Sequence, residues 1–65
     1  MEHSLRTFTR DGKLVYTESF RTADDAYKEY CDTIDNLKRN LPPRHEIVVA
    51  RFRNDMMMTM EVITR

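Results

Sequence analysis

The 65-residue chain is poor in the residues that build many catalytic and metal sites, with one Cys, one Gly, two Pro and no Trp. A single Cys excludes an internal disulfide, and no Cys or His pair has zinc-ligand spacing. One Gly cannot form a Gly-rich phosphate loop. No apolar run reaches the length of a signal peptide or a membrane span. We therefore expect a cytoplasmic protein with no cofactor, no metal and no membrane partner.

The chain also lacks a surplus of charge, since Lys plus Arg and Asp plus Glu each total 11. Zero net charge argues against general affinity for nucleic acid or for anionic membranes. The charges are unevenly distributed along the chain, because five acids lie between residues 24 and 35, in a segment that has helical spacing. We therefore expect one acidic and one basic side of the molecule.

Candidate catalytic groups are few. Cys31 with His3 or His45 is the sole conceivable thiol–imidazole pair. Nucleophilic catalysis needs a base and an orienting group that converge on the nucleophile. Cys31 falls in the middle of the expected helix, at the margin of its apolar stripe, whereas both His residues lie near expected strand starts. We therefore expect a protein that is not an enzyme and a Cys31 that is a small, buried or half-buried packing residue.

Residues 22 to 41 have the spacing of an amphipathic helix. Apolar residues recur at three- and four-residue steps, which places them on one stripe: Ala23, Ala26, Tyr27, Tyr30, Cys31, Ile34, Leu37 and Leu41. Thr22 followed by Asp25 resembles a capping box. Pro42 and Pro43 forbid continuation of the helix. A single helix cannot bury its own stripe, so the flanking segments must form a sheet against it.

Residues 3 to 20 predict a β-hairpin, because Asp11-Gly12 is a strong signal for a two-residue type I′ turn. This turn pairs Phe8 with Val15 and Arg6 with Thr17. One face then carries Leu5, Thr7, Thr9, Leu14, Tyr16 and Phe20, and it is the better core face. The opposite face carries Arg6, Phe8, Arg10, Lys13, Val15 and Thr17.

Residues 45 to 65 predict a second hairpin. A three-residue loop at residues 53 to 55 separates polar from apolar residues best, so we expect that register. It places one set of side chains against the helix: Val48, Ala50, Phe52, Met56, Met58, Met60 and Val62. The other set faces away: Ile47, Val49, Arg51, Met57, Thr59, Glu61 and Ile63.

The expected fold is therefore one α+β domain over residues 1 to 65, with element order ββαββ. Four strands form a mostly antiparallel sheet, and one helix packs on one of its faces. The order of the strands in the sheet is left open.

The uncovered face of this sheet is the most informative expected surface. It is apolar at its centre and framed by basic residues, a composition enriched in protein interfaces. The residues assigned to protein binding are Arg6, Phe8, Arg10, Lys13, Val15, Ile47, Val49, Arg51, Arg53 and Met57. The plain alternative is a half-exposed sheet that keeps Val and Ile for strand propensity. A functional alternative is single-stranded nucleic acid, with Phe8 stacking on bases, although one outward aromatic makes a poor platform.

The acidic face of the helix is a second candidate surface, because Asp25, Glu29 and Asp32 lie along one stripe. Such a stripe is typical of a solvated helix with an acidic N-terminal half. Lys28, Lys38 and Arg39 interrupt it, so a nucleic-acid mimic is disfavoured. We keep this face as the second choice for a protein contact.

Two segments resemble parts of the small early proteins of tailed phages: SFRTADDA at residues 19 to 26, which opens the acidic helix, and VARFR at residues 49 to 53. The resemblance covers residues 8 to 53 through element order and length, and the chain departs from those proteins in its second hairpin and its Met-rich last strand. Some of those proteins bind and inhibit host enzymes, including RNA polymerase. The resemblance implies a phage or mobile-element inhibitor that occludes a host protein in the host cytoplasm, with Arg51 and Arg53 as contacts. Self-association into a homodimer through the sheet face is expected as a further property, because so small a core gains from more burial.

Overall fold

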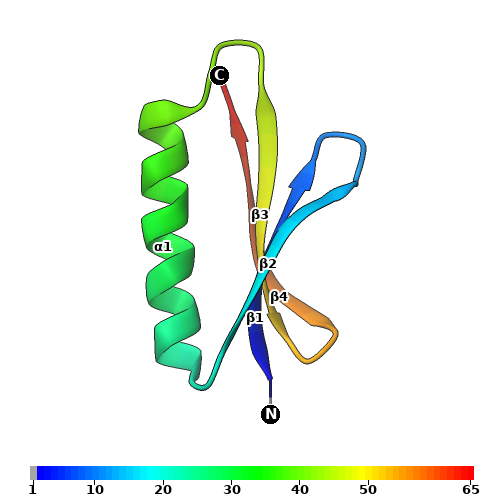
Figure 1. Cartoon of the computed structure of the whole chain (residues 1–65), viewed down its shortest axis with the longest axis vertical. Helices are drawn as coiled ribbons and strands as arrows, with labels where there is room; N and C mark the ends of the chain where they lie inside the picture. The colour runs from blue at the N-terminus through cyan, green and yellow to red at the C-terminus, as the bar shows by residue number, and fades with distance from the viewer. Residues whose placement is uncertain (1) are drawn as a thin grey trace.

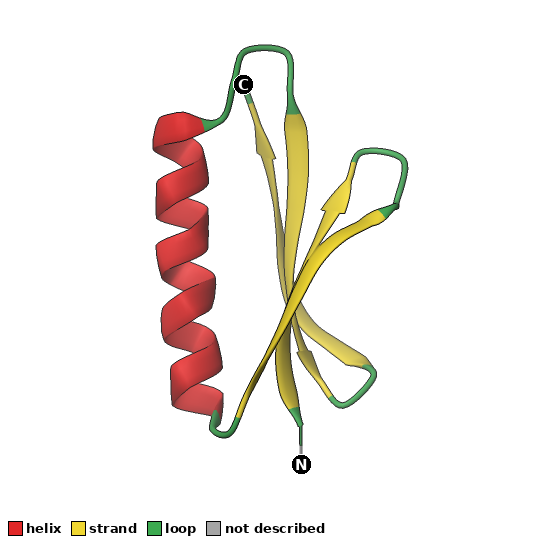
Figure 2. Ribbon diagram, in the orientation of Figure 1, coloured by secondary structure: helices red, strands yellow, loops and turns green. Residues whose placement is uncertain are grey.

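The computed structural model describes residues 2 to 65 and contains one sheet and one helix. In chain order the elements are β1 (His3–Thr9), β2 (Leu14–Phe20), α1 (Ala23–Asn40), β3 (Glu46–Arg53) and β4 (Met56–Thr64). The strands form a single antiparallel sheet in the order β2-β1-β3-β4, and α1 runs along one side of it (Figures 1 and 2). The expected ββαββ α+β fold is confirmed. No helix within residues 2 to 65 is both long enough and apolar enough to cross a bilayer.

Helix α1 begins where the sequence predicts. The Thr22 hydroxyl accepts a hydrogen bond of 3.1 Å from the backbone N–H of Asp25, which satisfies one of the free donors of the first turn. Asp24 and Asp25 lie in the first turn, where the positive end of the helix dipole favours acids. The apolar stripe is narrower than expected, because Ala23, Tyr27 and Cys31 are exposed.

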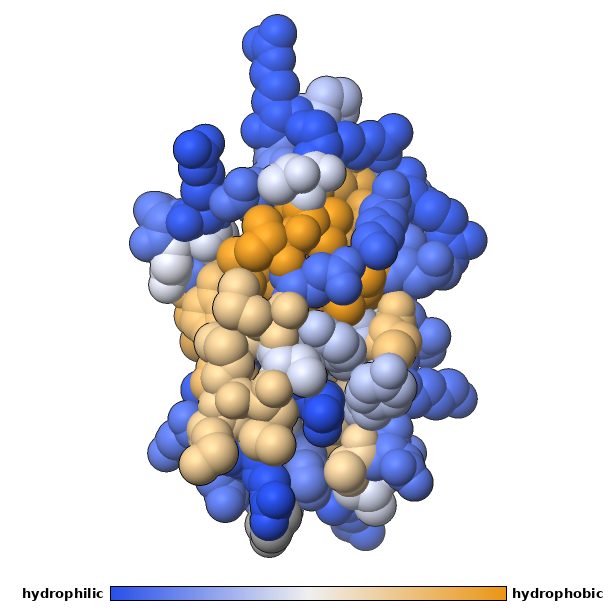
Figure 3. Space-filling model, turned by 180° about the vertical axis from the view of Figure 1, so that it is seen from behind, coloured by the Kyte–Doolittle hydropathy of each residue, from blue (hydrophilic) through white to orange (hydrophobic). Residues whose placement is uncertain are grey.

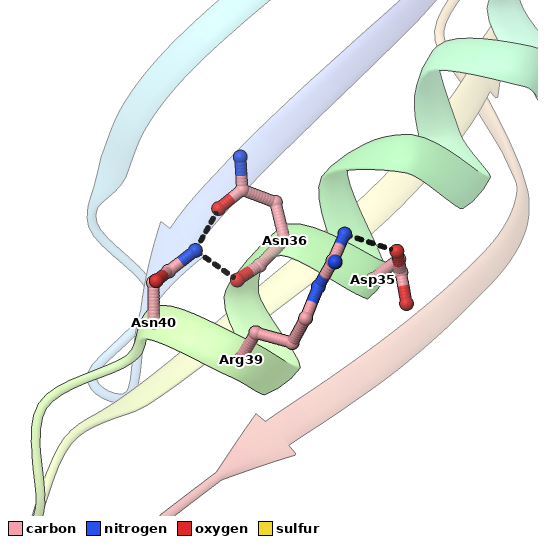
Figure 4. A network of polar contacts seen from close by, with 4 residues as sticks. All are labelled: Asp35, Asn36, Arg39 and Asn40. Atoms are coloured by element: carbon pink, nitrogen blue, oxygen red, sulfur yellow. Dashed lines mark hydrogen bonds and ion pairs between the residues drawn. The ribbon is translucent and has the colours of Figure 1, made fainter.

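The last turns of α1 carry their own polar network (Figure 4). The amide of Asn40 donates to the backbone carbonyl and the side-chain oxygen of Asn36, at 3.1 and 2.6 Å. Arg39 forms an i,i+4 ion pair with Asp35 on the solvent side, at 2.5 Å. These contacts hold the helix end where Pro42 stops further helical turns.

Arg65 joins the end of β4 to the end of α1. Its guanidinium donates to the backbone carbonyls of Arg39 and Leu41, both at 3.1 Å. Its backbone N–H donates to the carbonyl of His45, and its own carbonyl accepts from the N–H of Arg44. Helix-terminal carbonyls lack partners within the helix, so this arginine fixes the position of α1 along the sheet.

The core lies between α1 and one face of the sheet. It consists of Leu5, Tyr30, Ile34, Leu41, Val49 and Ile63, with Phe20, Leu37 and Ile47 packed against it. Leu5 and Val49 are the largest fully buried side chains. The burial of Leu5 confirms the core face expected for β1, whereas Leu14 and Tyr16 of β2, expected on the same face, are 49% and 53% exposed. The burial of Val49 contradicts the core face expected for the second hairpin.

The face assignment of the second hairpin was wrong because strand alternation separates two sets of residues without saying which set faces the helix. The pairing of β1 with β3 decides this. Leu5 lies opposite Arg51, and Thr7 lies opposite Val49. Directly opposed residues share a face. Once Leu5 points to the helix, Ile47, Val49 and Arg51 must follow it.

The first hairpin closes with a wider turn than the expected type I′. The N–H of Thr9 donates to the carbonyl of Lys13, and the N–H of Gly12 donates to the carbonyl of Thr9. Gly12 has a φ of 89°, whereas Asp11 has no positive φ. A type I turn that ends in a left-handed Gly encloses three loop residues and adds a bulge. Phe8 therefore lies opposite Leu14 instead of Val15, and the expected register returns below the bulge.

The second hairpin also differs at its tip. Asn54, with a φ of 53°, and Asp55 form a two-residue turn, and a bulge follows it between Arg51 and Phe52. Ala50 consequently lies opposite Met60, two residues beyond the expected Met58. A register shift of two residues leaves each side chain on the same face as the partners expected for it. The tip is the exception, because there Met57 lies opposite Phe52.

Candidate protein-binding surface

The face of the sheet opposite α1 carries a cluster of apolar side chains that no element covers. We call it the open-face patch. It is made of Met57, Met58, Met60 and Val62 on β4, beside Val48, Ala50 and Phe52 on β3. The four β4 side chains are 43% to 48% exposed. Figure 3, seen from the side opposite to Figure 1, shows apolar side chains gathered in one continuous area with hydrophilic residues around it.

An arginine and two aromatic rings pack together at the floor of the patch. The Arg6 guanidinium carbon lies 4.1 Å from the centroid of the Phe52 ring, within cation–π range. The ring of Phe8 lies 6.4 Å from the same ring. Arg6 also forms an ion pair of 3.5 Å with Asp55 in the hairpin turn. Arg6 is thus a fixed rim residue, and it leaves Phe52 only 8% exposed.

A surface of this kind is suited to bind protein. Methionine is unbranched and polarisable, so several adjacent Met side chains adapt to a partner's shape. Contiguous apolar area on a small protein marks an interaction site more often than scattered apolar residues do. Beside the patch, an open hollow of about 790 Å³ is lined by residues 53 to 56 and Met58.

The structure divides the predicted binding residues among several places. Arg6, Phe8 and Met57 do lie on the uncovered side. Three others face the helix: Ile47, Val49 and Arg51. The remaining four are exposed at the hairpin tips or on edge strand β2: Arg10, Lys13, Val15 and Arg53. The expectation of one surface framed by all four arginines was therefore wrong.

Arg51 shows why the expected basic frame does not form. Its guanidinium carbon lies 5.6 Å from the ring of Tyr27 on α1, so it packs under the N-terminal half of the helix. Its Nε atom is buried and has no hydrogen-bond partner within the described residues. Arg51 is half-buried and acts as a packing residue of the helix–sheet interface.

Six residues of the patch were placed in the core by the sequence prediction: Val48, Ala50, Phe52, Met58, Met60 and Val62. One sequence signal favours their observed position. Three of the four apolar residues in the competing set are β-branched, Ile47, Val49 and Ile63, whereas the set expected in the core contains three Met. Such side chains have few rotamers and fill a close-packed core well, whereas Met is common at adaptable binding surfaces.

The acidic surface of α1 is solvated. Asp25 and Asp32 are exposed, and Glu29 is partly buried and accepts a hydrogen bond of 3.5 Å from the Thr33 hydroxyl. Within residues 2 to 65, no three His, Cys, Asp or Glu side chains are grouped so that they could hold a metal ion.

Cys31 is exposed, which corrects the expectation of a buried or half-buried residue. A hydrogen bond with the Cys31 side chain raises the pKa of the Tyr27 hydroxyl. Nδ1 of His45 lies 3.0 Å from the carbonyl of Pro43, and Nδ1 of His3 is buried and has no hydrogen-bond partner among residues 2 to 65. In the part of the chain that the structure describes, neither imidazole is hydrogen-bonded to the thiol.

No protein-family model matches this chain, and neither the curated proteins nor the solved structures include a match.

Proposed function

We propose that the chain is a non-enzymatic interaction module that binds another protein through the open-face patch. One observation carries the proposal: four neighbouring apolar side chains on β4 remain nearly half exposed on a sheet face that no element covers. The rim supplies Arg6, Arg53 and Asp55 for polar contacts around this apolar centre. An apolar centre with a polar rim is the usual anatomy of a protein interface.

On this proposal the module acts by occlusion, because it has a flat binding face beside one open hollow. The resemblance in element order to small early phage proteins makes a host protein the proposed partner, in the host cytoplasm. Arg53 stays a proposed contact, since it is exposed beside the patch. Arg51 does not, since it packs under α1.

Single-stranded nucleic acid is the weaker candidate. Phe8 and Phe52 are neighbours on the open face, which favours stacking more than one outward aromatic would. The cations, however, do not line one groove. Arg10 and Lys13 lie at one hairpin tip, and Arg51 lies on the helix side. A backbone-tracking groove needs a continuous row of cations.

Affinity capture from bacterial lysate tests the proposal, with and without nuclease. The test variant is Met57→Glu/Val62→Lys, which introduces one charge of each sign into the patch and preserves the net charge. The matched control is Val15→Glu/Tyr16→Lys, which makes the same charge exchange at exposed apolar positions of β2. Each hot-spot side chain contributes more than about 1 kcal/mol to binding, so we expect retention of the partner to fall by at least about tenfold in the test variant only.

Two outcomes would contradict the proposal. If the control variant loses the captured protein and the patch variant keeps it, the contact lies on β2 or the hairpin tip. If nuclease treatment removes everything that is retained, and retention falls steeply with salt, the nucleic-acid candidate replaces protein binding.

A further inference from the structure

Strand β4 is a sheet edge with little protection against pairing beyond the bulge near its turn, where Phe52 lies opposite Met57 and Arg51 opposite Thr59. It lies at the end of the strand order and is nine residues long. Natural edges are commonly protected by Lys, Pro or inward-pointing charges. Residues 56 to 64 contain no Lys, Arg or Pro. Their one charged residue, Glu61, is turned to the helix side, where its carboxylate lies 3.1 Å from Nζ of Lys38.

The backbone N–H and C=O groups of β4 that are not bonded to β3 belong to residues whose side chains form the open-face patch. The N–H of Arg65 donates to the carbonyl of His45, so Arg65 points its backbone groups inward. Backbone direction alternates along an antiparallel strand. Ile63 and Glu61 therefore also pair with β3, whereas Met60 and Val62 present their N–H and C=O groups outward.

We propose that a second copy of this chain pairs with β4 in antiparallel fashion, about a two-fold axis that passes through Met60. Met60 is the midpoint of β4, whose bounds are Met56 and Thr64, so this register overlaps the whole strand in both copies. Met60 then exchanges two hydrogen bonds with its own counterpart, and Met58 lies opposite Val62 of the second copy. The interface is isologous, as a closed dimer requires.

The charges favour this register over its neighbours. With the axis at Met60, each Glu61 lies opposite Thr59 of the second copy, whose hydroxyl can donate to the carboxylate. With the axis one residue later, at Glu61, the two carboxylates would oppose each other directly, which destabilises a strand pair. The chosen register also joins the two open-face patches into one continuous surface. It does not require the foreign partner proposed above.

The proposed contact is small, because it joins one nine-residue strand of each copy. A standard protein interface buries about 800 Å² on each partner and involves about 20 to 30 residues a side. We therefore expect a dimer that forms at high concentration and dissociates on dilution.

The test is the solution mass of the full chain by light scattering and sedimentation, from about 10 μM to about 1 mM. The mass of the wild-type protein is expected to rise toward twice 7.8 kDa as the concentration increases.

Met60→Pro removes one outward N–H donor without removing a hydrogen bond to β3, and this variant is expected to stay monomeric. Thr17→Pro is the matched control on β2. The N–H of Thr9 donates to the carbonyl of Lys13, so by alternation Thr7 and Leu5 also direct their backbone groups to β2 and Arg6 does not. Thr17 lies opposite Arg6, so its N–H points away from the sheet. This control is expected to dimerise like wild type.

A second variant, Met60→Lys, keeps every backbone group and sets two like charges face to face at the axis. It is expected to halve the mass at high concentration even if the proline variant fails to fold. A wild type that stays monomeric at about 1 mM overturns the pairing. So does a dimer that persists in both Met60 variants, or one that Thr17→Pro abolishes. If the wild-type chain stays monomeric but still captures a partner through the patch, the proposed strand pairing is wrong and the proposed protein binding stands.

Discussion

Val49 and Val15 are the same residue type in opposite environments. Val49 is fully buried between α1 and the sheet, whereas Val15 is 57% exposed on an edge strand. Truncation of a buried aliphatic side chain removes transfer free energy and leaves a cavity. We expect Val49→Ala to lower the free energy of unfolding by about 2 kcal/mol. Val15→Ala should change it by less than about 0.5 kcal/mol, and urea denaturation measures both.

The difference in stability between Val49→Ala and Val15→Ala tests which face of the second hairpin α1 covers. The sequence prediction placed Val49 and Val15 on the same uncovered face. If the two alanine variants lose equal, small amounts of stability, Val49 is not in the core and α1 covers the other face of β3.

A single exposed contact governs the acid titration of the first hairpin. The Thr9 hydroxyl donates to the Asp11 carboxylate, and with a backbone hydrogen bond this holds the pKa of Asp11 below its ordinary value. A carboxyl whose pKa is lower in the folded state stabilises the fold above its unfolded pKa. That contribution is lost as the pH falls through the folded pKa. We expect Thr9→Val to raise the Asp11 pKa toward the ordinary value, as followed by NMR of the carboxyl carbon.

The matched control is Thr17→Val, which removes an exposed hydroxyl from β2. It should leave the Asp11 titration unchanged. Equal Asp11 titration curves in wild type and Thr9→Val would show that the threonine does not cause the shift.

At the scale of elements, the start of α1 depends on one hydroxyl oxygen. Thr22 caps the helix through the N–H of Asp25. Loss of an N-cap side chain costs about 1 kcal/mol, so we expect Thr22→Ala to destabilise the domain by that amount in urea. Thr22→Ser keeps the oxygen and should retain most of the stability. Equal losses in both variants would mean that the cap does not hold the helix.

The hairpin between β1 and β2 depends on Gly12 for a different reason. A Cβ built on Gly12 meets nothing within 4 Å, so space is not the constraint. The φ of 89° is the constraint, because side chains other than Gly rarely adopt it. We expect Gly12→Ala to lower the free energy of unfolding by about 1 kcal/mol and Gly12→Asn by less. An alanine variant as stable as wild type would contradict this turn geometry.

The elements themselves could be predicted from local patterns. The 3.6-residue period, the Thr22 cap and Pro42 determined the helix, and alternation with turn residues determined the four strands. The turn types could not be predicted as reliably. Both hairpins contain a bulge near the turn. A bulge adds one residue to a strand but leaves no mark in the residue types around it, so the sequence does not reveal it.

At the scale of the molecule, the binding surface depends on how the two hairpins meet. Each face of the second hairpin is apolar enough to serve as core, so its composition does not decide between them. The pairing of Leu5 with Arg51 decides, and that contact joins residues 46 positions apart, the difference between 51 and 5. The two- and 3.6-residue periods of the sequence describe single strands and helices, so they carry no information about this pairing between distant strands. The helix therefore covers Val49, and the Met residues of β4 become the open face.

The most direct test of the proposed surface is NMR of labelled methyl groups, recorded while the captured partner protein is added. We predict that the methyl signals of Met57, Met58 and Met60 shift or broaden, while that of Ala26, buried on the sheet side of α1, stays unchanged. Changes confined to backbone signals of the acidic helix residues, Asp25, Glu29 and Asp32, with the Met signals unchanged, would contradict it.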